Sequence, residues 1–262
     1  MKNWIPFIKS DPCVAVIRLQ GTIATSGRAL SDRGLAESIE KAFRSKPQAV
    51  ALEISSPGGS PVQSSLICAR IRKLADENDI PVYSFVEDVA ASGGYWLATA
   101  GDEIYVDRGS IIGSIGVISA GFGLTGILDK IGVERRVYTA GKSKSMLDPF
   151  QAEKPADVKR IKSLLDDLHV FFKDHVSSRR AGKLVDQDLF TGDIWVGQSS
   201  IDVGLADHLG HLNPTMKDRF GDKVKFRHFG QKKPLLSRLG ARIIDDAFGS
   251  IEDRAAYARF GL

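Results

Sequence analysis

The chain has 262 residues, of which 43% are hydrophobic and 26% charged, with a formal net charge of +4 and a pI near 9.0. This composition allows a buried core and excludes disordered and fibrous proteins. The basic residues are spread along the chain instead of forming a run interleaved with aromatic residues, which argues against nucleic acid as a partner.

The sequence gives little support for a membrane segment or a metal site. Residues 1–9 hold too short an apolar run for a secretory signal or a membrane anchor. Residues 109–128 are uncharged but contain six glycines, which makes them a poor membrane-spanning helix. Cys13 and Cys68 lack metal-ligand spacing and predict free buried thiols in a reducing compartment. These features predict a cytoplasmic protein without a metal.

Strands and helices alternate along the first half of the chain. Residues 14–19 form a predicted strand, and a helical face follows with apolar residues Leu35, Ile39, Ala42 and Phe43. The alternation continues to a predicted strand over residues 133–138. This order of elements predicts an α/β core.

A glycine pair follows the next predicted strand, in residues 50–61. Ser60 is suited to cap the following helix and Pro61 to its first position. Because glycine has no side chain, the loop can direct the N–H of Gly59 into a cleft. An ordinary turn punctuated by proline and glycine is the alternative.

Ser92 stands between a predicted strand over residues 81–86 and a predicted helix that includes residues 95–100. A serine on such a turn can expose its hydroxyl, and the N–H of Gly93 can stabilise a developing negative charge there. A plain helix cap is the alternative. Acyl-transfer sites usually take two N–H donors from separate segments, which makes Gly59 and Gly93 a candidate pair.

A lysine loop follows the predicted strand over residues 133–138. A lysine that is desolvated can lose its charge and accept the proton of a serine hydroxyl near neutral pH, so Lys144 is a candidate base. A solvated surface lysine is the common alternative. Lys142 is a rival, because residues two apart share a face in an extended segment.

The second half begins with a long amphipathic helix predicted over residues 155–180, which we expect to pack on the core or a neighbour. Near-helical spacing of apolar residues returns in residues 234–260. We therefore divide the chain into a domain over residues 1–230 and a helical tail over residues 231–262, whose role stays open. Contact of this tail with an anionic membrane surface is an alternative suggested by Lys232, Lys233 and Arg238.

Four motifs in order resemble one enzyme family. They are Ser-Pro-Gly-Gly, Ala-Ser-Gly-Gly-Tyr, Gly-Ser-Ile-Gly-Val and Gly-x-x-Lys-Ser, and residues 190–197 and 204–210 also fit its closing segment. The chain is similar to the signal peptide peptidase A family of serine peptidases, over residues 13–210. The resemblance implies a single catalytic domain with the Clp protease/crotonase-like α/β fold, built of repeated strand-strand-helix units.

The resemblance also implies roles for the residues that match these motifs. Ser92 is the expected nucleophile, Lys144 the general base, and Ser114 the serine that holds the lysine. The N–H groups of Gly59 and Gly93 form the expected oxyanion hole. The position of the lysine in the Gly-x-x-Lys-Ser motif of the family selects Lys144 over Lys142. A Ser-His-Asp mechanism is unsupported, because no histidine follows a glycine-rich nucleophile turn.

The implied activity is a serine endopeptidase that hydrolyses extended hydrophobic peptides, such as released signal peptides or misfolded segments. The resemblance implies that no cofactor is needed. It also implies a ring- or dome-like homo-oligomer in which neighbouring protomers can complete the Ser-Lys dyad. Two alternatives stay open. A crotonase-like acyl-CoA enzyme would share the fold but use acidic residues, and a non-catalytic scaffold would keep only the oligomer.

Overall fold

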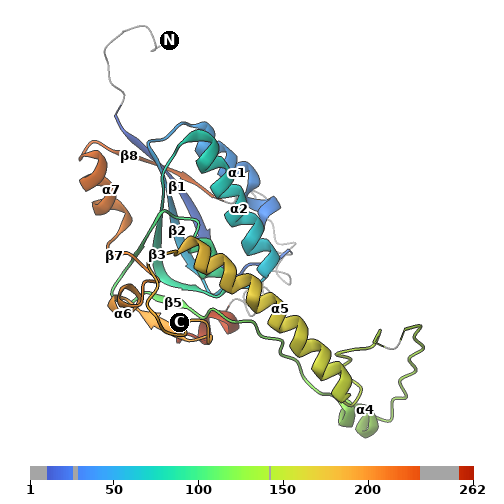
Figure 1. The fold of residues 1–262 in the computed structure, drawn as a ribbon. Helices are drawn as coiled ribbons and strands as arrows, with labels where there is room; N and C mark the ends of the chain where they lie inside the picture. The colour runs from blue at the N-terminus through green and yellow to red at the C-terminus, as the bar shows by residue number, and fades with distance from the viewer. Residues whose placement is uncertain (1–10, 26–28, 142, 231–253) are drawn as a thin grey trace.

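The computed structural model describes residues 11–25, 29–141, 143–230 and 254–262. An eight-stranded sheet forms the body, with the strand order β6-β5-β3-β2-β1-β8 and with β4 joining β3 to β7 (Figure 1). All paired strands are parallel except β5 and β6. The strands are β1 Cys13–Gln20, β2 Ala49–Ser56, β3 Val82–Ala91, β4 Glu103–Val106, β5 Ile111–Gly113, β6 Ile194–Val196, β7 His208–Leu209 and β8 Lys225–Phe229.

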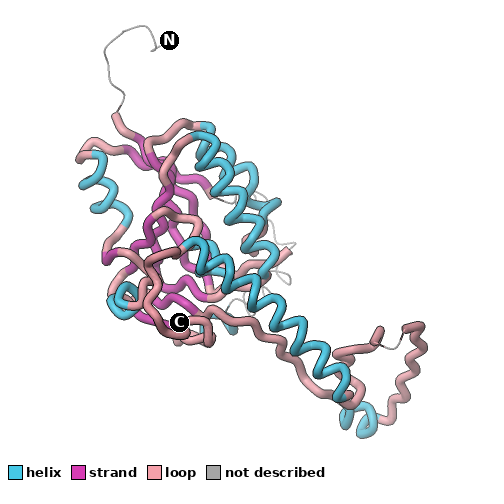
Figure 2. Tube along the Cα trace, in the orientation of Figure 1, coloured by secondary structure: helices cyan, strands magenta, loops and turns pink. Residues whose placement is uncertain are grey.

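Helices cover both faces of this sheet, as the tube in Figure 2 shows. On one face lie α1 Asp32–Arg44, α2 Pro61–Asn78 and α3 Gly93–Ala98, and on the other lies α7 Leu212–Phe220. Side chains alternate between the two cores with the period of a strand: Ile17 of β1 enters the first core and Val16 the second. The α/β fold predicted from the sequence is therefore confirmed.

The helical patterns in the first half formed as predicted. The buried residues of α1 are the four apolar residues of its predicted face. Ser60 caps α2, because its side chain accepts a hydrogen bond from the N–H of Gln63, and Pro61 occupies the first turn. The cap fixes where α2 begins, directly after the glycine pair.

Three neighbouring parallel strands end at the same edge of the sheet. β2 ends at Ser56, β3 at Ala91 and β5 at Gly113. The register pairs Ser56 with Ala90 of β3, and Ala91 of β3 with Gly113 of β5. The residues that follow each strand therefore meet at this edge, which is where ligands bind in parallel α/β sheets.

Residues 117–141 and 143–154 leave this body and form an arm together with the first half of α5, Pro155–Arg179 (Figure 1). The strand predicted over residues 133–138 is wrong: this segment has no strand pairing, and its residues are exposed. The arm also contains the short helix α4, Thr125–Ile131, which buries none of its residues. An apolar stretch forms a strand only where another strand supplies its backbone hydrogen bonds, and no strand of the described residues pairs with it.

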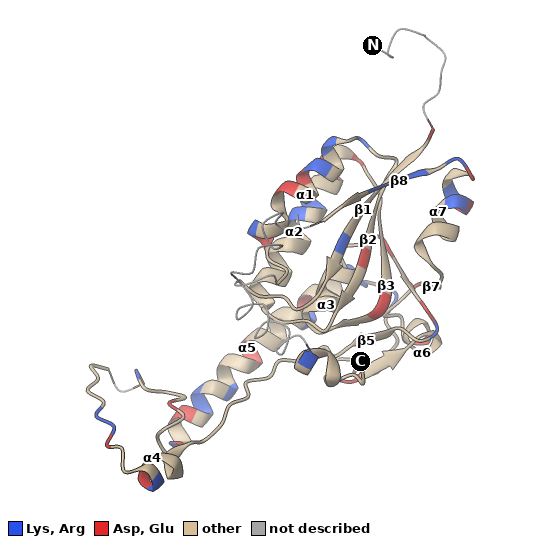
Figure 3. Cartoon of the chain, turned by 180° about the vertical axis from the view of Figure 1, so that it is seen from behind, with Lys and Arg blue, Asp and Glu red and all other residues tan. Residues whose placement is uncertain are grey.

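Residues 109–128 lie only partly in the folded core. Ile112 and Ile115 are buried, whereas residues 119–128 are mostly exposed. Helix α5 is likewise buried at one end only. Among its described residues, only Phe172 and Val176, near its C-terminal end, are buried. The colouring of Figure 3 shows basic and acidic residues along its outer half.

The closing segment is held to the body by a buried ion pair. Arg180, directly after α5, contacts Asp207 at 2.7 Å and donates to the carbonyl oxygen of Gly204. A buried tyrosine hydroxyl, that of Tyr95 in α3, donates to the carbonyl oxygen of Leu205. The short helix α6, Gln198–Asp202, lies between these contacts and β6.

Part of the predicted tail lies outside the described residues, including Lys232, Lys233 and Arg238. In its described part, residues 254–258 are helical. Within the described ranges, every helix is too short or too polar to cross a membrane.

Candidate active site

Ser92 lies on the turn between β3 and α3, as predicted. Its backbone has φ 52° and ψ −120°, a conformation that residues other than glycine rarely adopt. The backbone is held on both sides: Ser92 donates its N–H to the carbonyl oxygen of Gly113 at 2.8 Å and accepts from the N–H of Trp96 at 3.1 Å. This unfavourable geometry holds the side chain, which is half-buried, at the end of the sheet.

The backbone of Gly59 lies beside that of Gly93. A Cβ atom on Gly93 would lie 3.3 Å from the nitrogen of Gly59. A strand-like contact with Ile23 holds the glycine loop in place. The N–H of Ile23 donates to the carbonyl oxygen of Gly58, and its carbonyl oxygen accepts from the N–H of Ser60. Among the described residues, the N–H groups of Gly59 and Gly93 donate to no backbone carbonyl in a turn or loop.

The structure brings four of the five predicted site residues to one cleft. Ser92, Gly59, Gly93 and Ser114 line a cleft of about 340 Å³. Ser114 directly follows β5 and has φ 51°, and it donates its N–H to the carbonyl oxygen of Asp193 at 2.6 Å. The convergence of these residues follows from the common edge at which β2, β3 and β5 end.

The fifth predicted residue, Lys144, lies elsewhere in the single chain. It is exposed in the turn at residues 143–147 of the arm, and it does not line the cleft. Within one chain, Lys144 therefore lacks the burial that we expect of a lysine base. Its sequence rival, Lys142, lies outside the described residues.

Apolar side chains form much of the cleft wall. Trp96 comes from α3, Val117 and Ile118 from the chain after β5, and Leu168 and Phe172 from α5. Ile118 is 68% exposed, so part of this wall faces solvent. The cleft thus brings Ser92, Gly59 and Gly93 together beside an apolar surface.

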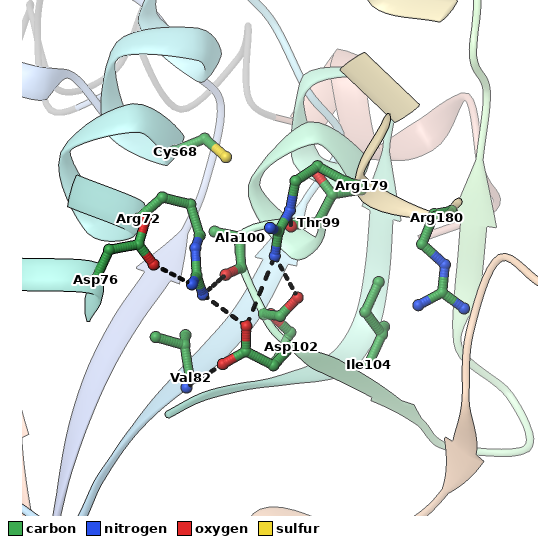
Figure 4. A network of polar contacts seen from close by, with 12 residues as sticks. Cys68, Arg72, Asp76, Val82, Thr99, Ala100, Asp102, Ile104, Arg179 and Arg180 are labelled. Atoms are coloured by element: carbon green, nitrogen blue, oxygen red, sulfur yellow. Dashed lines mark hydrogen bonds and ion pairs between the residues drawn. The ribbon is translucent and has the colours of Figure 1, made fainter. Parts of the chain in front are cut away.

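A polar cluster behind the cleft connects α2, α3 and α5, and sequence reasoning missed it (Figure 4). Arg179 of α5 donates to the carbonyl oxygen of Thr99 at 2.7 Å, and Arg72 of α2 donates to that of Ala100 at 3.1 Å. Asp102 accepts from Arg72 at 2.8 Å. These bonds fix the end of the helix that Ser92 begins. Spacing alone could not reveal them, because the partners lie far apart in the chain.

His175 of α5 joins this cluster. Its ring stacks on Trp96 at 4.3 Å, and its Nε2 lies 2.7 Å from the hydroxyl of Thr99. That hydroxyl donates to the carbonyl oxygen of Trp96, so its oxygen can accept a hydrogen bond from the neutral ring of His175 when Nε2 carries the proton. Burial and the nearby Arg179 lower the pKa of His175 to about 4. Burial also raises the pKa of the neighbouring Cys68 thiol to about 11.

We predict that His175 makes the protein less stable in mild acid. Its folded pKa lies below the unfolded value of 6.5, so only the unfolded chain takes up a proton as pH falls from 6.5 to about 4. The stability it contributes is complete above pH 6.5 and is lost across this window, by about 2 kcal/mol for a half-buried ring. Urea unfolding at pH 7 and pH 4.5 measures the loss.

The matched variant is His175→Gln, which keeps a hydrogen-bonding group for Thr99 but does not titrate. Its free energy of unfolding should change less between the two pH values than that of the wild type. His169→Gln, on the same helix, controls for the loss of a histidine. An equal pH dependence in wild type and His175→Gln would show that His175 is not responsible.

Comparison with known proteins identifies the family. The model of peptidase family S49 matches residues 75–220, which is more than half of the chain, and the model of the NfeD1b N-terminal domain matches residues 14–125. The chain is 30% identical to the chloroplastic serine protease SPPA of Arabidopsis thaliana, over 76% of this chain and 30% of that protein.

A second relative is much longer than the chain. A protein of Brucella abortus named Na(+)/H(+) antiporter NhaA is 47% identical over all of this chain, which corresponds to 39% of that protein. The chain thus spans less than two fifths of either relative.

A solved structure supports the fold. It is a lysine-to-alanine mutant of the membrane-bound stomatin-specific protease 1510-N, in complex with a substrate peptide. The TM-score is 0.50 at 15% identity, and the match covers 93% of this chain and 99% of that one. Together with the family match, this likeness confirms the Clp protease/crotonase-like fold. The chain belongs to peptidase family S49, the family of the signal peptide peptidase A type.

Proposed function

We propose that the chain is an endopeptidase that cleaves extended hydrophobic peptides with Ser92 as its nucleophile. The observation that carries this proposal is the position of Ser92, held in a strained turn beside the N–H groups of Gly59 and Gly93. A peptide carbonyl carbon at Ser92 Oγ would direct its oxygen toward these two donors.

The reaction proceeds through an acyl-enzyme. The Oγ of Ser92 attacks the carbonyl carbon while its proton passes to the neutral amine of Lys144. The resulting oxyanion accepts hydrogen bonds from Gly59 and Gly93. The C–N bond then breaks, and the ammonium group of Lys144 returns the proton to the leaving amine. Water hydrolyses the ester by the same steps, with Lys144 again taking and returning the proton.

Lys144 is supplied by a neighbouring copy of the chain in this proposal. Two observations support it: Lys144 is exposed away from the cleft of its own chain, and the arm that carries it exposes large apolar side chains. Such a surface is typical of a site that another protein covers. These side chains include Phe122, Ile127, Ile131, Val133, Tyr138 and Leu147. Covering the arm disfavours a charged amine, and Ser114 then orients the neutral one.

The apolar wall supports the substrate class. An extended peptide can place side chains against Trp96, Leu168 and Phe172 while its backbone passes Ser92. Released signal peptides and misfolded segments are peptides of this kind. Membership of a peptidase family does not favour the alternatives of an acyl-CoA enzyme or a scaffold.

Intact mass after reaction with a fluorophosphonate probe tests the nucleophile. Wild type should gain one adduct, because the Oγ of Ser92 displaces fluoride from phosphorus. Ser92→Ala should gain none, whereas Ser119→Ala, which changes an exposed serine beyond the cleft, should react like wild type. An unmodified wild type, in a sample shown by light scattering to be assembled, would contradict the proposal.

A further inference from the structure

Three successive carbonyl oxygens directly after α3 each accept a hydrogen bond from a guanidinium group. The Nε of Arg179 donates to the carbonyl oxygen of Thr99 at 2.7 Å, and its Nη2 donates to that of Gly101 at 3.0 Å. Arg72 of α2 donates to the carbonyl oxygen between them, that of Ala100, at 3.1 Å. Carbonyl groups at the end of a helix have no partner within it, so these bonds hold the end of α3 in place.

The other end of α3, where Ser92 lies, depends on the same bonds. The helix has six residues and begins with Gly93 and Gly94, which add little stiffness of their own. Ser92 before them has φ 52°, and a residue in such a strained conformation keeps it only when the surrounding structure holds it on both sides. One side is its hydrogen bond to Gly113. The other side is α3, so release of the far end of this helix lets the backbone of Ser92 relax and moves its Oγ.

The cluster also joins the other elements that carry the site (Figure 4). The carboxylate of Asp102 accepts from Arg72 at 2.8 Å and from the N–H of Val82, the first residue of β3, at 2.9 Å. Strand β3 leads to Ser92, and α2, which carries Arg72, begins directly after the glycine loop. The two arginines and Asp102 therefore tie α2, β3 and α3 together behind the cleft.

We infer that Arg179 is a positioning residue that keeps the Oγ of Ser92 in its reactive orientation by holding the end of α3. This inference deepens the proposed function and rests on it, since it assumes that Ser92 is the nucleophile. Arg179 does not line the cleft, so it acts through α3 and not by contact with the peptide. It makes two of the three carbonyl bonds, so its loss releases the helix most. A shift of about 1 Å in a reacting group lowers a rate by about 10²-fold.

The rate at which a small alkyl fluorophosphonate labels Ser92 tests this role in the full, assembled chain. Arg179→Ala should be labelled about 10²-fold more slowly than wild type, at equal concentrations of folded protein. Arg179→Lys should be labelled about tenfold more slowly, because one ammonium group cannot reproduce the two directed bonds of a guanidinium group. Arg44→Ala, which removes an exposed arginine from the last turn of α1, is the matched control and should equal wild type.

Added guanidinium distinguishes positioning from a general loss of stability. The side chain of Arg179 is 28% exposed, so the cavity that Arg179→Ala leaves opens to solvent. A low, non-denaturing concentration of guanidinium chloride should raise the labelling rate of Arg179→Ala about tenfold and leave that of wild type unchanged. Sodium chloride at the same ionic strength controls for salt. A variant that is merely unstable would gain nothing, because guanidinium weakens folded proteins.

Two results would overturn the inference: labelling of Arg179→Ala at the wild-type rate, or slow labelling that guanidinium does not accelerate. If Arg179→Ala does not fold, Arg179→Lys decides, and labelling of that variant at the wild-type rate overturns the inference. These results leave the proposed function standing, since Ser92 is still labelled in wild type. An unlabelled wild type would instead contradict the proposed function.

Discussion

Replacing Lys144 by alanine is expected to lower kcat for an apolar peptide by about 10³- to 10⁴-fold, because the serine hydroxyl then lacks a base for its proton. The loss should appear in kcat and in kcat/KM alike, since the lysine contributes to the transition state and not to peptide binding. Steady-state hydrolysis, measured at equal concentrations of folded protein, tests this expectation.

The matched control is Lys142→Ala, two residues earlier in the sequence. It should retain most of the wild-type kcat. A large loss in Lys142→Ala together with an active Lys144→Ala would assign the base to the other lysine and contradict the family register.

Mixing two inactive variants tests where the lysine comes from. Ser92→Ala contributes Lys144, and Lys144→Ala contributes Ser92. If each cleft combines residues of two neighbouring copies, random co-assembly in equal amounts restores about a quarter of wild-type activity. Unmixed samples of each variant are the controls. A mixture no more active than its components, with co-assembly verified, would place both groups of the dyad in one chain.

Gly59→Ala is expected to lower kcat by about 10²- to 10³-fold, the usual effect of losing one oxyanion donor. Gly59 has φ +142°, and an added Cβ would lie only 2.1 Å from the carbonyl oxygen of Ile23. The loop must therefore move away from Ile23, which carries the Gly59 N–H away from the position where the oxyanion forms. The measurement is kcat at saturating peptide, below the unfolding temperature of both proteins.

The control for this substitution is Gly109→Ala, in the turn between β4 and β5. The added Cβ there would come no closer than 3.4 Å to the Asp107 side chain, which is ordinary contact. Its kcat should match that of the wild type. If Gly59→Ala folds and keeps its kcat, Gly59 does not supply an oxyanion donor.

The sequence best predicted those parts of the site that depend on residues close together in the chain. The turn that carries Ser92 joins a buried strand to a helix, and both elements are recognisable from residue periodicity and from the glycines after the serine. The cap at Ser60 is equally local, because a helix cap joins residues three apart. These predictions needed no knowledge of how distant segments meet.

The predicted strand over residues 133–138 failed because a strand is not a local structure. Its β-branched residues, Val133 and Val137, favour extended backbone, but a strand forms only beside another strand. Their exposure of 51% and 40% shows that the single chain does not cover this segment. The same limit explains why the outer half of α5 has apolar residues with little to pack against.

By itself, the sequence determined most of the secondary structure and, through its motifs, the family and the candidate chemistry of Ser92. The tertiary structure alone decided that Gly59, Ser92 and Ser114 share a cleft, that Lys144 lies outside it, and that Phe260 reaches it. The physical reason is the order of the strands. Segments distant in sequence meet only because β2, β3 and β5 are neighbours that end at one edge, and no local periodicity encodes that order.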